Sequence, residues 1–200
     1  GKLIDLDPES IQIDQESDRI IEEALLVDEG EIAWRRTLRL SSRLSDAQSL
    51  SRPLPLRLRS DACYLVTGAF GALGQLVCRT LVSRGARRLI LMSRTKIPDR
   101  REWARCTDLR VLRCIDFIRE LESLGASAIL APVDVTDEQG LEAWLHNFRE
   151  QGLPPIRGVF HLAGQVRDTL VTEMTKETFD AAYDPKVIGA FNLHRHLDGE

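Results

Sequence analysis

The stretch of sequence that decides the fold is Thr67-Gly68-Ala69-Phe70-Gly71-Ala72-Leu73-Gly74. It follows an apolar run at residues 63–66 that is typical of a buried strand, and it leads into an apolar-periodic segment at residues 73–84 that is typical of a helix. A strand, a glycine-rich turn and a helix in this order form the phosphate-binding unit of dinucleotide-binding domains. The sequence therefore predicts such a unit at the start of an α/β domain.

Each glycine of this turn has its own physical reason. Gly68 permits the sharp turn, Gly71 lets the backbone approach a pyrophosphate without a Cβ, and Gly74 lets the helix pack closely on the strand. The free N–H groups and the positive dipole end of the helix then face the phosphates. We predict a cofactor-binding loop whose further members are Thr67, Phe70, Ala72 and Leu73. The alternative is a generic glycine-rich turn, which leaves the residues after the second strand unexplained.

Strands and helices alternate through the rest of the chain. Strands are predicted at residues 89–92, 126–133 and 156–162, and helices at residues 109–124, 137–151 and 176–197, the last broken near Pro185. Residues 96–108 read as a polar insertion. This alternation is typical of an α/β fold with a Rossmann-like, doubly wound parallel sheet, here with an incomplete set of strands.

The residues before the glycine-rich turn follow a different pattern. A short strand is predicted at residues 2–7, a helix at 17–26, and a strand or hairpin arm at 32–40. This segment is too short to bury a core of its own, and the residues after it are rich in Ser, Arg and Pro. The expected organisation is a first segment at residues 1–45, a linker at 46–60 and an α/β domain at 61–200.

Ser93 and Arg94 close the second predicted strand, about 20 residues beyond the glycines, where NAD-dependent enzymes commonly place an acidic residue on the ribose hydroxyls. No acid is present here. A hydroxyl and a guanidinium can instead donate hydrogen bonds to a 2′-phosphate. The sequence therefore predicts NADPH as the cofactor. The alternative is that Arg94 is a solvated charge at a strand end.

Further candidates end the third and fourth strands of the α/β domain, at the edge where doubly wound sheets bind ligands. Asp134 and Val135 suit the adenine end of a dinucleotide, and His161, Ala163 and Gly164 suit the nicotinamide-ribose end. Asp134 could instead cap the next helix, although Asp137 is better placed for that. His161 could be a hydrogen-bonded core histidine.

Composition excludes several classes of function. The net charge of −4 gives no reason to expect nucleic acid as a partner, and no apolar stretch approaches the ~20 residues needed to span a bilayer. We expect a cytoplasmic protein. The four cysteines show no zinc-ligand spacing, so no metal site is predicted and all four are interpreted as reduced and structural.

These motifs resemble those of polyketide-synthase ketoreductases, which belong to the short-chain dehydrogenase/reductase superfamily. The segments TGAFGALG, LILMSR, VDVTD, GVFHLAG and PKVIGAFNLH occur in that family's order and spacing, over residues 64–194. The early segments GKLIDLDP and EGEIAWRRTLRL resemble the closing part of the family's structural subdomain. The resemblance implies that residues 1–45 are the C-terminal part of that subdomain. It also implies that residues 61–200 are the N-terminal part of the NADPH-binding catalytic subdomain.

The resemblance also implies an activity. Such domains use NADPH to reduce a β-ketoacyl group, tethered to an acyl carrier protein through phosphopantetheine, to a β-hydroxyacyl group, and their partners are that carrier and the other polyketide synthase domains. Lys186, in PKVIGAFNLH, is implied as the catalytic lysine. The family's catalytic serine and tyrosine are expected after Glu200, so the 200 residues alone are expected to be inactive. Tyr183 lies at Tyr-x-x-Lys spacing instead of Tyr-x-x-x-Lys and is interpreted as a packing residue.

Two other functions are open at this point: the ketoreductase of an animal-type fatty acid synthase, and a non-catalytic Rossmann scaffold or cofactor sensor. Asp168 in Val-Arg-Asp matches the last position of the family's Leu-Asp-Asp motif, which implies a B-type product configuration.

Overall fold

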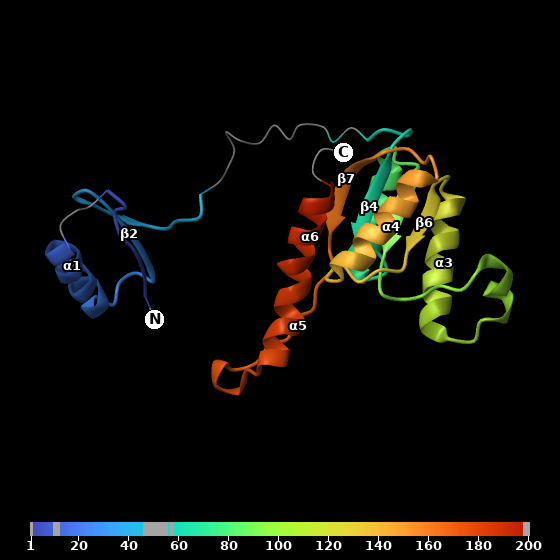
Figure 1. Ribbon diagram of the computed structural model, residues 1–200. Coiled ribbons are helices and arrows are strands. Elements are labelled where there is room, and N and C mark those ends of the chain that lie inside the picture. Colours follow the sequence, from blue (N-terminus) through green and yellow to red (C-terminus); the bar gives the residue numbers. More distant parts are fainter. Residues whose placement is uncertain (1, 10–12, 46–55, 57, 198–200) are drawn as a thin grey trace. The chain divides into compact units, whose positions relative to one another are not determined.

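The computed structural model describes residues 2–9, 13–45, 56 and 58–197, and it divides the chain into two compact units, Gly1–Leu54 and Pro55–Glu200 (Figure 1). Most of the linker predicted at residues 46–60 lies outside the described residues. We describe each unit by itself.

The first unit is a three-stranded sheet with one helix. Its elements are β1 (Leu3–Asp5), α1 (Ile13–Leu25), β2 (Glu31–Arg35) and β3 (Leu38–Ser41). β1 pairs with β2 in parallel, and β2 pairs with β3 antiparallel. The segment predicted as a strand or hairpin arm is therefore a complete hairpin. Its turn contains Arg36, whose φ of 55° lies in the left-handed region.

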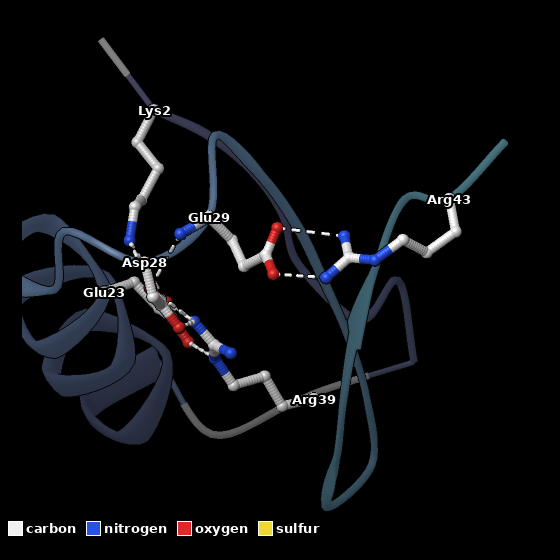
Figure 2. A network of polar contacts seen from close by, with 6 residues as sticks. All are labelled: Lys2, Glu23, Asp28, Glu29, Arg39 and Arg43. Carbon is white, nitrogen blue, oxygen red and sulfur yellow. Dashed lines mark hydrogen bonds and ion pairs between the residues drawn. The ribbon is translucent and has the colours of Figure 1, made fainter.

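A buried carboxylate ties this unit together. Glu23 on α1 is only 1% exposed, and its Oε1 accepts a hydrogen bond of 2.6 Å from Arg39 Nε on β3. Lys2 lies 3.8 Å from the other oxygen, and Asp28 binds both Lys2 and Arg39 (Figure 2). The network joins the residue before β1, α1, β3 and the loop before β2, so it compensates for the small apolar core of this unit.

The second unit contains a four-stranded parallel sheet in the order β6-β5-β4-β7. The strands are β4 (Cys63–Thr67), β5 (Arg88–Met92), β6 (Ser127–Ala131) and β7 (Ile156–His161). The helices that connect them are α2 (Ala72–Ser83), α3 (Leu109–Ser123) and α4 (Glu138–Glu150). The predicted α/β fold with a Rossmann-like parallel sheet is confirmed.

Helices cover both faces of this sheet, because successive side chains of a strand point to opposite sides. Tyr64 and Val66 of β4 pack in one cluster with α2 and α3, whereas Cys63 and Leu65 pack in a second cluster with α4. Figure 1 shows α4 lying across one face of the sheet. The burial of every residue of β4 explains its continuous apolar sequence.

The insertion at residues 96–108 is more ordered than its polar composition predicts. It contains the 3₁₀ helix η2 (Arg100–Arg105), anchored by Trp103, which is 7% exposed. The Trp103 indole Nε1 donates a hydrogen bond of 2.8 Å to the Pro98 carbonyl, and the guanidinium carbon atoms of Arg100 and Arg119 lie 4.8 Å and 5.6 Å from its ring centroid. One aromatic side chain therefore fixes the segment to α3.

The chain after β7 passes through the 3₁₀ helix η3 (Val171–Glu173) into α5 (Lys176–Lys186) and α6 (Ile188–Leu197). The two helices are separated at Val187, which confirms the predicted break near Pro185. Proline lacks the N–H that the helix ladder needs at this position. Among the described residues, no helix is long and apolar enough to cross a membrane.

Candidate cofactor-binding site

A cleft of about 220 Å³ opens at the carboxyl edge of the four-stranded sheet. Its walls come from the ends of all four strands, from the glycine-rich turn and from the end of α5. Nine predicted site residues line it: Thr67, Gly68, Gly71, Ser93, Arg94, Asp134, Val135, Ala163 and Gly164. Sequence reasoning missed the other five lining residues, which are Met92, Val133, Leu162, Gln165 and Pro185.

The glycine-rich turn is held against the end of β7. Gly68 has φ of 63°, and a Cβ built there would lie 2.8 Å from the Leu162 carbonyl oxygen, so no larger residue fits. A Cβ on Gly74 would lie 2.8 Å from the backbone of Ala69. At Gly71, which lines the cleft, the nearest atom to such a Cβ is the Gly68 carbonyl oxygen at 3.3 Å, a tighter contact than usual but less severe than those at Gly68 and Gly74.

The N-terminus of α2 differs from those of the later helices. The Asp108, Asp137 and Thr175 side chains accept hydrogen bonds from first-turn amides of α3, α4 and α5. α2 has Gly71 as its N-cap and no side-chain cap hydrogen bond. Its first-turn N–H groups and the positive end of its dipole are therefore free to bind an anion at the cleft.

Ser93 and Arg94 follow β5 on the same side of the cleft as Asp134. The Arg94 side chain is 68% exposed, and its Nη1 lies 3.8 Å from Asp134 Oδ2. Asp134 Oδ1 accepts hydrogen bonds of 3.0 Å and 2.8 Å from the amide and hydroxyl of Thr136, which orient the carboxylate. The guanidinium therefore faces the cleft with most of its hydrogen-bond donors unused by that long contact.

Thr67 joins the end of β4 to the end of β7. Its hydroxyl oxygen accepts hydrogen bonds of 3.0 Å from the amides of both Leu162 and Ala163. The same oxygen lies 2.7 Å from His161 Nδ1. Thr67 thus shapes the cleft by fixing the chain that follows β7.

Lys186, at the end of α5, does not line the cleft itself but packs beside it. A Cβ on Gly164 would lie 3.5 Å from Lys186 Cε, so the aliphatic part of the lysine packs over this glycine. α6 is fixed to the opposite wall: a Cβ on Gly189 would lie 2.7 Å from Val135 Cγ1, and Asn192 Nδ2 donates a hydrogen bond of 3.0 Å to the Val135 carbonyl. Asn192 is 3% exposed. The signal available in the sequence was an asparagine three residues after a glycine within the apolar helical segment at residues 188–197.

The remaining predicted site residues do not line the cleft. Phe70 packs edge-on against Phe117 of α3, with ring centroids 6.2 Å apart, so only its backbone belongs to the turn. Ala72, Leu73 and Gly74 form the first turn of α2. His161 lines a separate hollow with Val159, Ala190, Leu193, His194 and Leu197. Tyr183 stacks on Phe179, with ring centroids 5.2 Å apart, and its interpretation as a packing residue stays a prediction.

A parallel sheet with helices on both faces, a glycine-rich turn at its carboxyl edge and an uncapped helix terminus define a Rossmann-type nucleotide-cofactor domain. A family model described as KR domain matches residues 62–200. The chain belongs to this ketoreductase family, within the short-chain dehydrogenase/reductase type of fold.

The chain is similar to parts of very large polyketide synthases. It is 43% identical over 136 residues to a 6-methylsalicylic acid synthase of Arthrobotrys oligospora, covering 68% of this chain and 8% of that protein. It is 42% identical over 140 residues to a phenolphthiocerol/phthiocerol polyketide synthase protein of Mycobacterium tuberculosis, covering 70% of this chain and 8% of that protein.

Solved ketoreductase structures share the fold. An N-terminal ketoreductase from the macrolactin assembly line matches with a TM-score of 0.69 and 25% identity, over 100% of this chain and 37% of the other. An A-type ketoreductase from a modular polyketide synthase matches with a TM-score of 0.68 and 30% identity, over 98% and 38%. The chain therefore spans well under half of each of these relatives.

Proposed function

We propose that this chain binds NADPH for the reduction of a β-ketoacyl group on an acyl carrier protein, within a polyketide synthase. The observation that carries the proposal is that the uncapped N-terminus of α2 and the Ser93-Arg94 pair lie at one cleft. The first suits a pyrophosphate and the second suits a 2′-phosphate. NADPH has both groups, whereas NADH has only the pyrophosphate.

Two residues without side chains line the cleft where such a cofactor would approach the backbone. Gly71 and Gly164 line it without side chains, and a Cβ at Gly71 would fill the approach to the α2 amides. Asp134 and Val135 form the wall proposed for the adenine end. Ala163 and Gly164 form the wall proposed for the nicotinamide ribose, where Lys186 also lies.

When bound, NADPH supplies the hydride that reduces the substrate carbonyl. This chain would hold the cofactor and would place Lys186 beside the nicotinamide ribose. Its ammonium can bind the ribose hydroxyls, and its positive charge can lower the pKa of the tyrosine that the family uses as proton donor. We do not assign that role to Tyr183, because it stands three residues before Lys186 instead of four.

The relatives named above are polyketide synthases, which favours a polyketide over a fatty acid synthase context. The B-type product configuration stays a prediction, as does a cytoplasmic location. Asp168 is an exposed residue in the segment between β7 and η3.

The test is a pair of fluorescence titrations of the 200-residue chain with NADPH and with NADH. We expect NADPH to bind at least ~10-fold more tightly, because one charged phosphate contact contributes about 1.5–3 kcal/mol. Equal affinities would contradict the proposed cofactor. No binding of either nucleotide would favour a non-catalytic scaffold.

A further inference from the structure

A chain of hydrogen bonds connects the glycine-rich turn with the bend between α5 and α6. Thr67 Oγ1 lies 2.7 Å from His161 Nδ1, and His161 Nε2 lies 2.8 Å from the Pro185 carbonyl oxygen. The imidazole therefore bridges β4, through Thr67, and α5, through Pro185. Its ring does not line the cofactor cleft, and it borders the hollow between β7 and α6 instead.

The positions of the hydrogens follow from the number of partners. The Thr67 hydroxyl oxygen already accepts from the amides of Leu162 and Ala163, so its own hydrogen is the one available for His161 Nδ1. A carbonyl oxygen can only accept, so His161 Nε2 must carry a hydrogen that it donates to Pro185. Both ends require the same neutral tautomer, with the hydrogen on Nε2.

The Pro185 carbonyl belongs to the peptide bond that leads into Lys186. α6 beyond the bend is fixed by Gly189 and Asn192, both of which contact Val135. Before the bend, His161 holds the chain at Pro185, one residue from the lysine whose side chain packs over Gly164. Displacement of this carbonyl would therefore move the base of Lys186 relative to the cleft.

We propose that His161 is a positioning residue: by donating from Nε2 to the Pro185 carbonyl, it holds Lys186 at the nicotinamide-ribose end of the cleft. This inference rests on the proposed function of the cleft. In this inference His161 holds α5 in place, whereas a direct contact with the cofactor was expected from the sequence.

The tautomer can be measured directly on the unmodified chain. We expect the ¹⁵N spectrum of His161 near neutral pH to show a protonated Nε2 and an unprotonated Nδ1 that couples to the Thr67 hydroxyl. His194, an exposed residue that borders the same hollow, is the internal reference. A hydrogen on Nδ1 of His161 would overturn the proposal.

Three variants test the consequence for binding. His161→Phe keeps a ring but removes both nitrogens, His161→Gln keeps a donor that can reach the Pro185 carbonyl, and His194→Phe is the matched control. We expect His161→Phe to weaken NADPH and NADH alike by about 5- to 10-fold, the effect of one hydrogen bond. His161→Gln should stay within about 3-fold of the parent, and His194→Phe should not differ from it.

The pattern separates a positioning role from a general loss of structure. The NADPH/NADH ratio should be unchanged in His161→Phe, because both nucleotides share the nicotinamide-ribose end. In ¹³C-dimethyllysine spectra, the NADPH-induced shift of Lys186 should disappear in His161→Phe, with Lys176 as the reference. Unchanged affinities or an unchanged Lys186 shift would contradict the inference.

Failure of the proposed function would look different, since the parent chain itself would then not bind NADPH. If His161→Phe does not fold, two other measurements test the inference: the tautomer of His161 in the parent chain and the NADPH affinity of His161→Gln. A His161→Gln chain that is folded but binds more than about 10-fold more weakly would count against the single hydrogen bond as the cause.

Discussion

We propose that Arg94 sets which nicotinamide cofactor the cleft prefers. Its guanidinium is 68% exposed and makes one long contact of 3.8 Å with Asp134, so it has donors left for a 2′-phosphate. We expect Arg94→Ala to weaken NADPH binding by about 10- to 100-fold, equivalent to about 1.5–3 kcal/mol, and to leave NADH binding unchanged. Isothermal titration with both nucleotides measures the two effects.

The matched control for this variant is Arg157→Ala. Arg157 is an exposed arginine near the start of β7, at the opposite edge of the sheet from the cleft. Arg157→Ala removes one positive charge but no phosphate contact, so the affinities for NADPH and NADH should both equal those of the parent. An equal drop in NADPH affinity for the two variants would show that net charge, and not Arg94, attracts the cofactor.

The cysteines differ in reactivity because they differ in burial. Burial raises the pKa of Cys78 to about 12, and burial also raises the pKa of Cys63 and Cys114. Since the thiolate is the reactive form, these three should resist iodoacetamide at about pH 8. We expect iodoacetamide to label the partly exposed Cys106 in the folded chain. In denaturant the other three cysteines should become accessible and should be labelled as well. Peptide mass spectrometry identifies the labelled positions. Rapid labelling of Cys78 in the folded chain would contradict its place in the core.

At the scale of one element, the two ends of the first turn of α2 respond differently to substitution. Gly71 has φ of −72° and ψ of 165°, which any residue adopts, whereas a Cβ on Gly74 would lie 2.8 Å from the Ala69 backbone. We expect Gly71→Val to cost about 1–2 kcal/mol of stability, because valine is a poor N-cap residue and its Cβ would lie 3.3 Å from the Gly68 carbonyl oxygen, but to abolish NADPH binding in a chain that still folds. Gly74→Ala should instead lower the free energy of unfolding by about 1–3 kcal/mol.

Urea unfolding and NADPH titration of both variants check this difference. The decisive comparison is between a folded Gly71→Val chain that does not bind and a Gly74→Ala chain that is less stable. A folded Gly71→Val chain with full affinity would mean that the α2 terminus does not hold the pyrophosphate.

Elements with a strong apolar pattern could be predicted from the sequence. β4 is fully buried and α3 presents one apolar side, so each has a clear run or period, and both lie close to their predicted positions. The β2–β3 hairpin could not be predicted as such, because its turn at Arg36 uses neither glycine nor asparagine. The ordered structure of η2 depends on one anchor, Trp103. The mostly polar composition of residues 96–108 gives no sign of this order.

The parts of the site whose positions follow from the backbone topology could be predicted from the sequence. The glycines and the residues directly after the strands are at fixed places in a doubly wound sheet, so Gly68, Ser93 and Asp134 could be located without a structure. The roles of Pro185 and Asn192 could not, because they depend on how α5 and α6 pack against β7 and Val135. His161 was expected at the nicotinamide-ribose end, with a hydrogen-bonded core histidine as the alternative, and its ring nitrogens contact Thr67 and the Pro185 carbonyl.

At the scale of the whole molecule, the two units are stabilised in different ways. The second unit has two apolar clusters, whereas the first relies on the ion network around Glu23. We expect Glu23→Gln to lower the stability of the first unit by about 1–3 kcal/mol, because Arg39 loses a charged partner in a buried place. Thermal unfolding followed through NMR signals of β2 measures this, with β4 signals as the reference.

The same carboxylate predicts an acid sensitivity. The hydrogen bond from Arg39 holds the pKa of Glu23 below its usual value of 4.5. Its stabilisation is therefore complete above that usual value and is lost as the pH falls through the lower folded-state pKa. Between about pH 7 and pH 3, the unfolding temperature of the first unit, followed through the β2 signals, should fall more in the parent than in Glu23→Gln. An equal loss in both would exclude Glu23 as the source.

The central claim is that one cleft at the carboxyl edge of the sheet holds NADPH, and a ¹H–¹⁵N titration of the whole chain with NADPH tests it most directly. We predict that the amide signals of Gly68, Gly71, Arg94 and Gly164 shift to saturation with one common dissociation constant, because all four residues line that cleft. Signals of β2 and β3 in the first unit should not move. The account would be contradicted if those four amides stayed unchanged at saturating NADPH, or if the shifts lay elsewhere on the chain.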